Sequence, residues 1–90
     1  MTAGSDDVTI EFPCSYPIKV MGRREAAFRA HVLAVMERHA PGFDRAAVTE
    51  RDSRKGTYQS LTVTITATGE TQLRAIFLDL KASPLVHMVL

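Results

Sequence analysis

The sequence predicts an α+β fold, a two-layer sandwich in which two helices cover one face of a four-stranded antiparallel sheet. Three patterns predict this arrangement. Residues 60–67 alternate strictly between polar and apolar side chains, as a strand with one buried face does. Two longer segments, one before and one after this strand, repeat apolar side chains at helical spacing. Shorter extended segments precede, separate and follow these helices.

Length and composition limit the chain to one domain. Its 90 residues are 46% hydrophobic and 23% charged, which is enough apolar material for a buried core. A single cysteine, Cys14, excludes an internal disulfide and a metal site built on paired thiolates. No apolar run approaches the length of a membrane span. We therefore expect a protein of the reducing cytoplasm that has no membrane partner.

We expect residues 1–11 to form a mobile leader and residues 12–90 to form a single domain. The leader contains three acidic residues and no basic one, so the domain holds all 11 basic residues against seven acidic ones. The resulting net charge of +4 permits an anionic ligand. It falls short of the basic stripe of a dedicated nucleic-acid-binding protein.

The first strand is expected just before the first helix. Prolines begin and end residues 13–17, which opposes a helix and favours an extended chain. Ile18 and Val20 then alternate with Lys19, which predicts a strand with one buried face. Gly22 is expected to end this strand.

The first helix is expected to open at Arg23-Arg24-Glu25 and to stop at Pro41-Gly42. Basic residues lie in its last turn, where positive charge meets the negative end of the helix dipole. Its apolar stripe consists of Phe28, Val32, Val35 and Met36.

Two further strands are expected to form a hairpin. The segment from Ala46 to Asp52 alternates weakly, and its charges suit the edge of a sheet. Residues 53–56 predict the turn. The strand that follows is the clearest in the chain. Its apolar side is Leu61, Val63, Ile65 and Ala67, and its polar side is Ser60, Thr62, Thr64 and Thr66.

The second helix is expected to have Thr68 as its N-cap, and residues 85–90 form a final apolar strand. The order is therefore β-α-β-β-α-β. Right-handed crossovers place both helices on the same face of the sheet, with the first and third strands in its centre. This is the ferredoxin-like arrangement. The apolar stripe of the second helix consists of Leu73, Ile76, Phe77 and Leu80.

The ferredoxin-like arrangement hosts many activities, so the function has to be argued from side chains. Tyr58 is the only aromatic residue of the third strand, which disfavours RNA recognition by base stacking. The histidines, His31, His39 and His87, fall on different elements, so we expect no metal site. An acyl phosphatase orients its water with an asparagine, and this chain has none. We therefore expect no enzyme, no catalytic residue and no cofactor.

Several short motifs resemble, at matching spacings, those of a known family. They are Phe12-Pro13, Ile18–Gly22, Arg38–Pro41, Ser53–Ser60, Ala67-Thr68 and Met88–Leu90. Together they are similar to the YbeD-like family of small bacterial proteins of uncharacterised function. The resemblance implies a fold like that of the ACT regulatory domains, a cytoplasmic bacterial protein and no known catalysis. Some members of the family carry a lipoate-regulatory label.

The similarity to ACT domains implies a place where a ligand would bind. Those domains hold an amino-acid effector near the first strand-helix turn, which here is Met21, Gly22, Arg23 and Arg24. Gly22 would let a ligand approach the backbone, and the helix N-terminus would attract a carboxylate. Two other interpretations stay open. Gly22 is a turn glycine with a positive φ, and the arginines are a solvated helix start.

The sequence thus favours a non-enzymatic regulatory or adaptor protein that binds a small metabolite (an amino acid or a lipoate-related compound) or a partner protein. The partner surface is expected at the edge strands or on the polar side of the third strand, and edge pairing would give a homodimer. The alternative is a nucleic-acid-associated protein that contacts phosphates through the basic hairpin of Arg51, Arg54 and Lys55. A third hypothesis is a minor enzyme that clamps an anion with Arg23 and Arg24.

Overall fold

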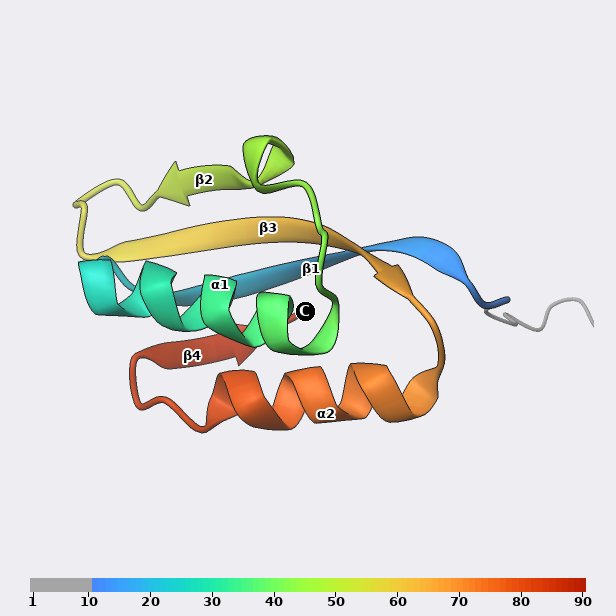
Figure 1. Cartoon of the computed structure of the whole chain (residues 1–90). Helices are drawn as coiled ribbons and strands as arrows, with labels where there is room; N and C mark the ends of the chain where they lie inside the picture. Colours follow the sequence, from blue (N-terminus) through green and yellow to red (C-terminus); the bar gives the residue numbers. More distant parts are fainter. Residues whose placement is uncertain (1–10) are drawn as a thin grey trace, which may run out of the picture.

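The computed structural model describes residues 11–90, in which two helices lie against one face of a four-stranded sheet (Figure 1). Of the expected leader, only Glu11 falls within the described residues. Neither helix of this part of the chain is long and apolar enough to cross a membrane. The elements are β1 (Cys14–Arg23), α1 (Ala26–His39), a 3₁₀ turn (Arg45–Ala47), β2 (Thr49–Asp52), β3 (Tyr58–Ala67), α2 (Glu70–Lys81) and β4 (Val86–Val89).

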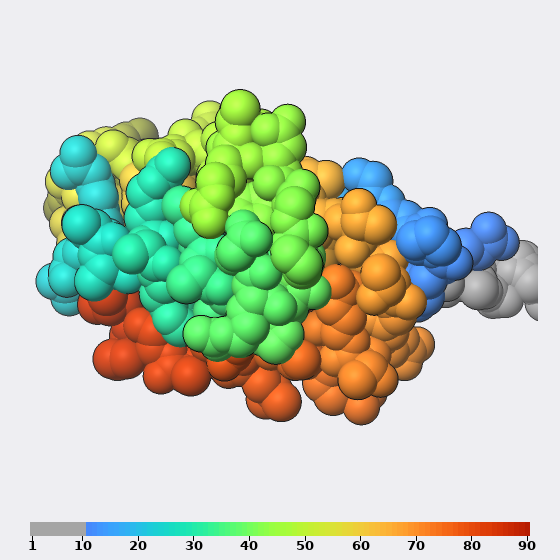
Figure 2. Space-filling model, in the orientation of Figure 1, coloured from blue at the N-terminus to red at the C-terminus, as the bar shows by residue number. Residues whose placement is uncertain are grey.

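The sheet has the strand order β2-β3-β1-β4, and every neighbouring pair is antiparallel. The predicted ferredoxin-like fold is therefore confirmed, with β1 and β3 in the centre. Figure 1 shows α1 and α2 side by side on the same face, as right-handed crossovers require. In the space-filling view the two helices and the segment after α1 form a continuous layer over that face (Figure 2).

The core lies between this helix layer and the sheet. It contains the apolar side of β3, the strand residues Ile18 and Val20, and the whole predicted stripe of α1. From α2 it takes Leu73, Ile76 and Leu80. Phe77, which the spacing assigned to the same stripe, is only partly buried and packs at the border of the core.

Strand β1 is longer than predicted and contains a proline in its middle. It pairs with β3 over all ten residues, from Cys14 to Arg23, whereas β4 pairs with it only from Val20 to Gly22. Leu90 extends this ladder by two backbone hydrogen bonds with Lys19. Because backbone groups of a strand alternate in direction, Pro17 and Lys19 both turn their nitrogens toward the β4 side. Pro17 therefore removes no hydrogen bond from the β1–β3 ladder.

Several predicted element boundaries are wrong. Gly22 does not end β1, which runs on to Arg23, and α1 begins at Ala26 with Glu25 as its N-cap rather than at Arg23-Arg24-Glu25. Ala46 lies in the 3₁₀ turn, where its backbone N–H donates to the carboxylate of Asp44 at 3.0 Å, so β2 begins only at Thr49. Helix α2 has Gly69 rather than Thr68 at its N-cap. The backbone N–H of Thr68 donates instead to Gln72 Oε1 at 2.8 Å, because the Gln72 side chain reaches back over the first turn.

Gly22 is the point where β1, α1 and the segment before β4 come closest. A Cβ atom at this position would lie 2.3 Å from the carbonyl oxygen of Leu85 and 2.4 Å from Cε1 of Phe28. Its φ is not positive, unlike that of Gly42 and Gly56, so the interpretation of Gly22 as a positive-φ turn glycine is wrong. The space that a side chain would fill is taken by the Phe28 ring. Gly22 is therefore required by packing.

We expect Gly22→Ala to lower the free energy of unfolding by about 1–3 kcal/mol, because the added methyl group overpacks a closed site. Urea denaturation of the variant and the native protein measures the difference. Gly69→Ser is the control, since a Cβ there meets no atom within 4 Å and serine suits an N-cap. A Gly22→Ala protein as stable as the native one would contradict the packing role.

Candidate functional site

The face of the sheet turned away from the helices, the open face, carries the outward side chains of all four strands. Pairing across the sheet fixes which residues share it, because facing residues point to the same side. The open face comprises Ser15, Pro17, Lys19, Met21 and Arg23 of β1, Thr49 and Arg51 of β2, Tyr58, Ser60, Thr62, Thr64 and Thr66 of β3, Met88 of β4, and Leu90.

The charged side chains of β2 are divided between the two faces of the sheet, with its acids on the helix side and Arg51 on the open face. Glu50 and Asp52 point toward the helix layer, where Glu50 pairs with Arg29 and Asp52 with Arg24 of the segment leading into α1, at 3.2 Å. Gln59 Nε2 also donates to both carboxylates, at 3.2 Å and 3.4 Å. Arg51 lies on the other side of the strand. None of the four strands, all within residues 11–90, therefore places an acidic side chain on the open face.

Two cations meet on the open face around a pair of hollows. One hollow, of about 200 Å³, is lined by Met21 and Tyr58 together with Asp52, Ser53 and Gln59. The other, of about 230 Å³, is lined by Thr49 and Thr62 together with Glu50. Lys19, Arg51 and Ser60 line both hollows and so lie where they adjoin. Within the described part of the chain neither Lys19 nor Arg51 forms an ion pair. The arrangement suits an anion.

Exposed apolar and aromatic side chains lie near these hollows: Tyr58 lines one of them, Met88 faces Met21, and Leu90 faces Lys19 across the β1–β4 pair. Tyr58 is 43% exposed, Met88 50% and Leu90 63%. The ring of Tyr58 meets that of His87 edge to face, with centroids 5.2 Å apart and planes at 74°. This contact fixes the tyrosine ring beside the hollow of Met21. A ligand on the open face would therefore meet apolar surface as well as positive charge.

The predicted site at Met21–Arg24 is split by strand geometry. Met21 and Arg23 face the open side, Gly22 is buried under Phe28, and Arg24 turns back toward Asp52. A hollow of about 290 Å³ does lie beside Arg24 at the start of α1, but its two arginines pair with the carboxylates of β2. Of the four predicted residues only Met21 lines the hollows of the open face.

The predicted basic hairpin is also divided. Arg51 belongs to β2 and joins Lys19 on the open face, while Arg54 and Lys55 lie in the turn before β3. The sequence alone does not identify Lys19 as a site residue. Its alternation with Ile18 and Val20 does show that it points away from the core. What the sequence lacked was the register that brings Lys19 near Arg51.

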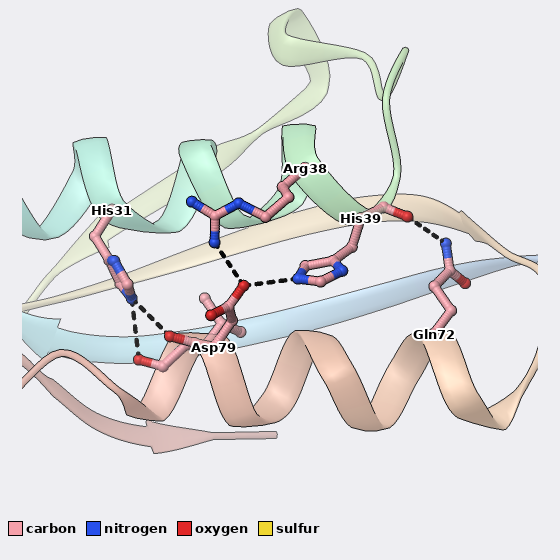
Figure 3. Close-up of polar contacts among 6 residues, drawn as sticks. His31, Arg38, His39, Gln72 and Asp79 are labelled. Atoms are coloured by element: carbon pink, nitrogen blue, oxygen red, sulfur yellow. Dashed lines mark hydrogen bonds and ion pairs between the residues drawn. The ribbon is translucent and has the colours of Figure 1, made fainter.

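A second polar cluster links α1 to α2, on the side of the sheet that the helices cover (Figure 3). Arg38 Nη1 and His39 Nε2 each lie 2.7 Å from Asp79 Oδ2, and His31 Nε2 donates to the carbonyl oxygen of Asp79 at 3.0 Å. Gln72 Nε2 donates to the carbonyl oxygen of His39 at 2.9 Å. Hydrogen bonds from His39 and then Arg38 lower the pKa of Asp79, because they stabilise its charged form. This α1–α2 clasp is a structural link.

The three histidines do not converge. His31 and His39 belong to the clasp, whereas His87 lies on β4 beside Tyr58. Across residues 11–90, histidine, cysteine, aspartate and glutamate form no group of three that could hold a metal ion.

Comparisons with known proteins show a family and a fold. The model described as "Protein of unknown function (DUF493)" matches residues 7–90. A UPF0250 protein of Azotobacter vinelandii is 54% identical over 82 residues, covering 90% of this chain and 89% of the relative. UPF0250 protein NE1487 of Nitrosomonas europaea is 42% identical over 86 residues, covering 96% and 99%. The predicted kinship with a small uncharacterised bacterial family is confirmed.

Two solved structures share the fold at low sequence identity. The solution structure of protein HP0495 from H. pylori has a TM-score of 0.74 at 17% identity and covers 100% of this chain and 94% of that one. The C-terminal domain of the MgtC protein from Mycobacterium tuberculosis has a TM-score of 0.64 at 17% identity, covering 91% and 89%. At these identities the likeness concerns the fold alone.

The lowered pKa of Asp79 predicts a pH-dependent contribution to stability. A carboxylate whose folded pKa lies below its ordinary 3.8 stabilises the fold above that value, and the contribution is lost as the pH falls through the folded pKa. We expect Asp79→Asn to be less stable than the native protein at pH 7, and the difference to shrink as the pH falls below 3.8. Urea denaturation over a pH series measures it.

Glu70→Gln is the control for this measurement, since Glu70 lies on the same helix and has no ion pair among the described residues. A gap between Asp79→Asn and the native protein that stays constant with pH would contradict the charge-based role of the clasp.

Proposed function

Since this chain belongs to the DUF493 family of proteins of unknown function, we propose that it acts by binding, as a small non-enzymatic regulatory or adaptor protein of the cytoplasm, and that the open face is its binding surface. One observation carries the proposal. Lys19 and Arg51 line the same two hollows and have no ion-pair partner among the described residues, whereas Asp52 and Glu50, which line one hollow each, pair their carboxylates with Arg24 and Arg29. The side chains around them are hydroxyls, a thioether, a phenol, the Gln59 amide and two carboxylates that already pair with arginines, a set that suits binding.

The proposed occupant is an acidic segment of a partner protein. Charge complementarity favours an anionic group, and the exposed Met88 and Leu90 favour a ligand that also offers apolar side chains. The hollows, at about 200 Å³ and 230 Å³, are smaller than the pockets that enclose most of a small ligand, which are typically about 300–1,000 Å³. A flat face suits a protein segment better than an amino acid or a lipoate-related compound.

The alternative ligand, a nucleic acid, fits the open face less well. Arg51, Arg54 and Lys55 would meet phosphates, but single strands also need aromatic faces on which bases stack. Tyr58 supplies one ring on this face, and His87 already holds that ring edge to face. Methionine and leucine make up much of the remaining exposed apolar surface.

We expect a short synthetic peptide rich in glutamate and leucine to shift the backbone amide NMR signals of Lys19, Arg51 and Ser60 in particular. The double variant Lys19→Glu/Arg51→Glu should bind the peptide at least about tenfold more weakly, because it reverses the charge around the hollows. Arg74→Glu/Lys81→Glu is the matched control, since it makes the same charge change on exposed residues of α2. It should bind as the native protein does.

Three outcomes would overturn this proposal. The first is an absence of shifts, or equal losses in both double variants. The second is tighter binding of a single-stranded oligonucleotide at the same residues and salt concentration, which would favour the nucleic-acid alternative. The third is a dimer in sedimentation equilibrium that only Lys19→Glu/Arg51→Glu separates, since a second copy would then be the occupant.

A further inference from the structure

We infer that the open face recognises a particular side-chain pattern: one carboxylate held between Lys19 and Arg51, with an apolar side chain from the same side of the partner segment in the hollow of Met21 and Tyr58. This inference rests on the proposed function and adds to it the chemistry of the recognised segment.

The register of the sheet places the two cations within reach of one anion. Lys19 on β1 faces Thr62, and Arg51 on β2 faces Ser60, so the two cations flank β3 on opposite sides. Two strand spacings separate them laterally by about 9–10 Å, with an offset of about 7 Å along the strands. Lysine and arginine are long enough to close that gap over Ser60, and both side chains do line the same two hollows.

The surface between Lys19 and Arg51 is formed by Ser60, which is polar and shielded from solvent. Ser60 is only 8% exposed although it belongs to the open face, because Met21 and Arg51 flank it on the neighbouring strands. A carboxylate above it would meet an ammonium, a guanidinium and a hydroxyl. Arginine binds both oxygens of a carboxylate through its planar fork, which lysine complements as a point charge. Two like charges that share a hollow also repel each other until an anion lies between them.

The hollow on one side of the cations differs from the hollow on the other. Toward Tyr58 the lining includes the thioether of Met21 and an aromatic ring, and methionine adapts its shape to irregular apolar ligands. Toward Thr49 and Thr62 the lining is polar, with two hydroxyls and Glu50, whose carboxylate pairs with Arg29. The pair of hollows therefore distinguishes the ends of a ligand, with apolar contacts on one side of the anion and polar contacts on the other.

An extended segment would satisfy this arrangement through alternate residues. Side chains two positions apart point to the same side and lie about 7 Å apart, whereas adjacent side chains point to opposite sides. The recognised pattern is therefore a glutamate or aspartate with an apolar residue two positions away. An apolar residue directly beside the acid would face away from the sheet.

Two synthetic peptides of identical composition test this pattern on the native protein. One has the order Leu-Ser-Glu-Ser-Leu and the other Ser-Leu-Glu-Leu-Ser, each blocked at both ends, so that only the side of the leucines changes. We expect the first to bind at least about fivefold more tightly by NMR titration. The preference should disappear in Met21→Ala/Tyr58→Ala and persist in Thr64→Ala, which lies on the open face outside both hollows.

The outcomes separate the inference from the proposal beneath it. Equal binding of both peptides, still weakened by Lys19→Glu/Arg51→Glu, would overturn the pattern and leave the acidic-segment proposal standing. Binding of neither peptide would overturn both. A preference for the second peptide would also overturn the pattern, and since this comparison uses the native protein, it does not depend on the folding of any variant.

Discussion

The two faces of this sheet differ because side chains of a strand alternate, and the distribution of charge between the faces depends on how β2 follows that rule. Glu50 and Asp52 reach Arg29 and Arg24, while Arg51 stays on the opposite side. All four paired side chains are about half exposed, so each ion pair adds little to stability. Their consequence is the distribution of charge: acids are neutralised on the helix side, and the open face keeps its cations.

The two sides of the sheet consequently differ in role. The helix layer closes the core, whereas the open face is largely exposed to solvent. Polar side chains of the two helices bond to each other in the α1–α2 clasp, and the buried stripes of both helices pack on the sheet. The open face contributes almost nothing to the core, with Ser60 as its one buried member. Changes to Lys19 or Arg51 therefore remove no group from the core, which makes the open face easy to probe by substitution.

Most of the fold could be predicted from the sequence. Strict alternation in β3 is compatible only with a half-buried strand, and each apolar stripe only with an amphipathic helix. The start of β2 could not be predicted. Thr49–Asp52 is polar at every position, so no alternation of apolar and polar residues shows where the strand begins. The role of Gly22 was hidden for a different reason. Its partner Phe28 is on α1, and only the docked helix shows that no Cβ fits there. The predicted Met21–Arg24 cluster was contiguous in sequence, yet strand geometry divides it between faces.

The open face itself could be predicted only in part. The hydroxyl side of β3 was visible as a polar face, but Lys19 and Arg51 come together through the register of three strands, which no local pattern encodes. Because β4 is short, the first half of β1 has no neighbour within residues 11–90 on the side away from β3, and Pro17 offers no N–H there. An incoming strand would find an interrupted template, so Pro17 protects the free edge against aggregation and fibre growth.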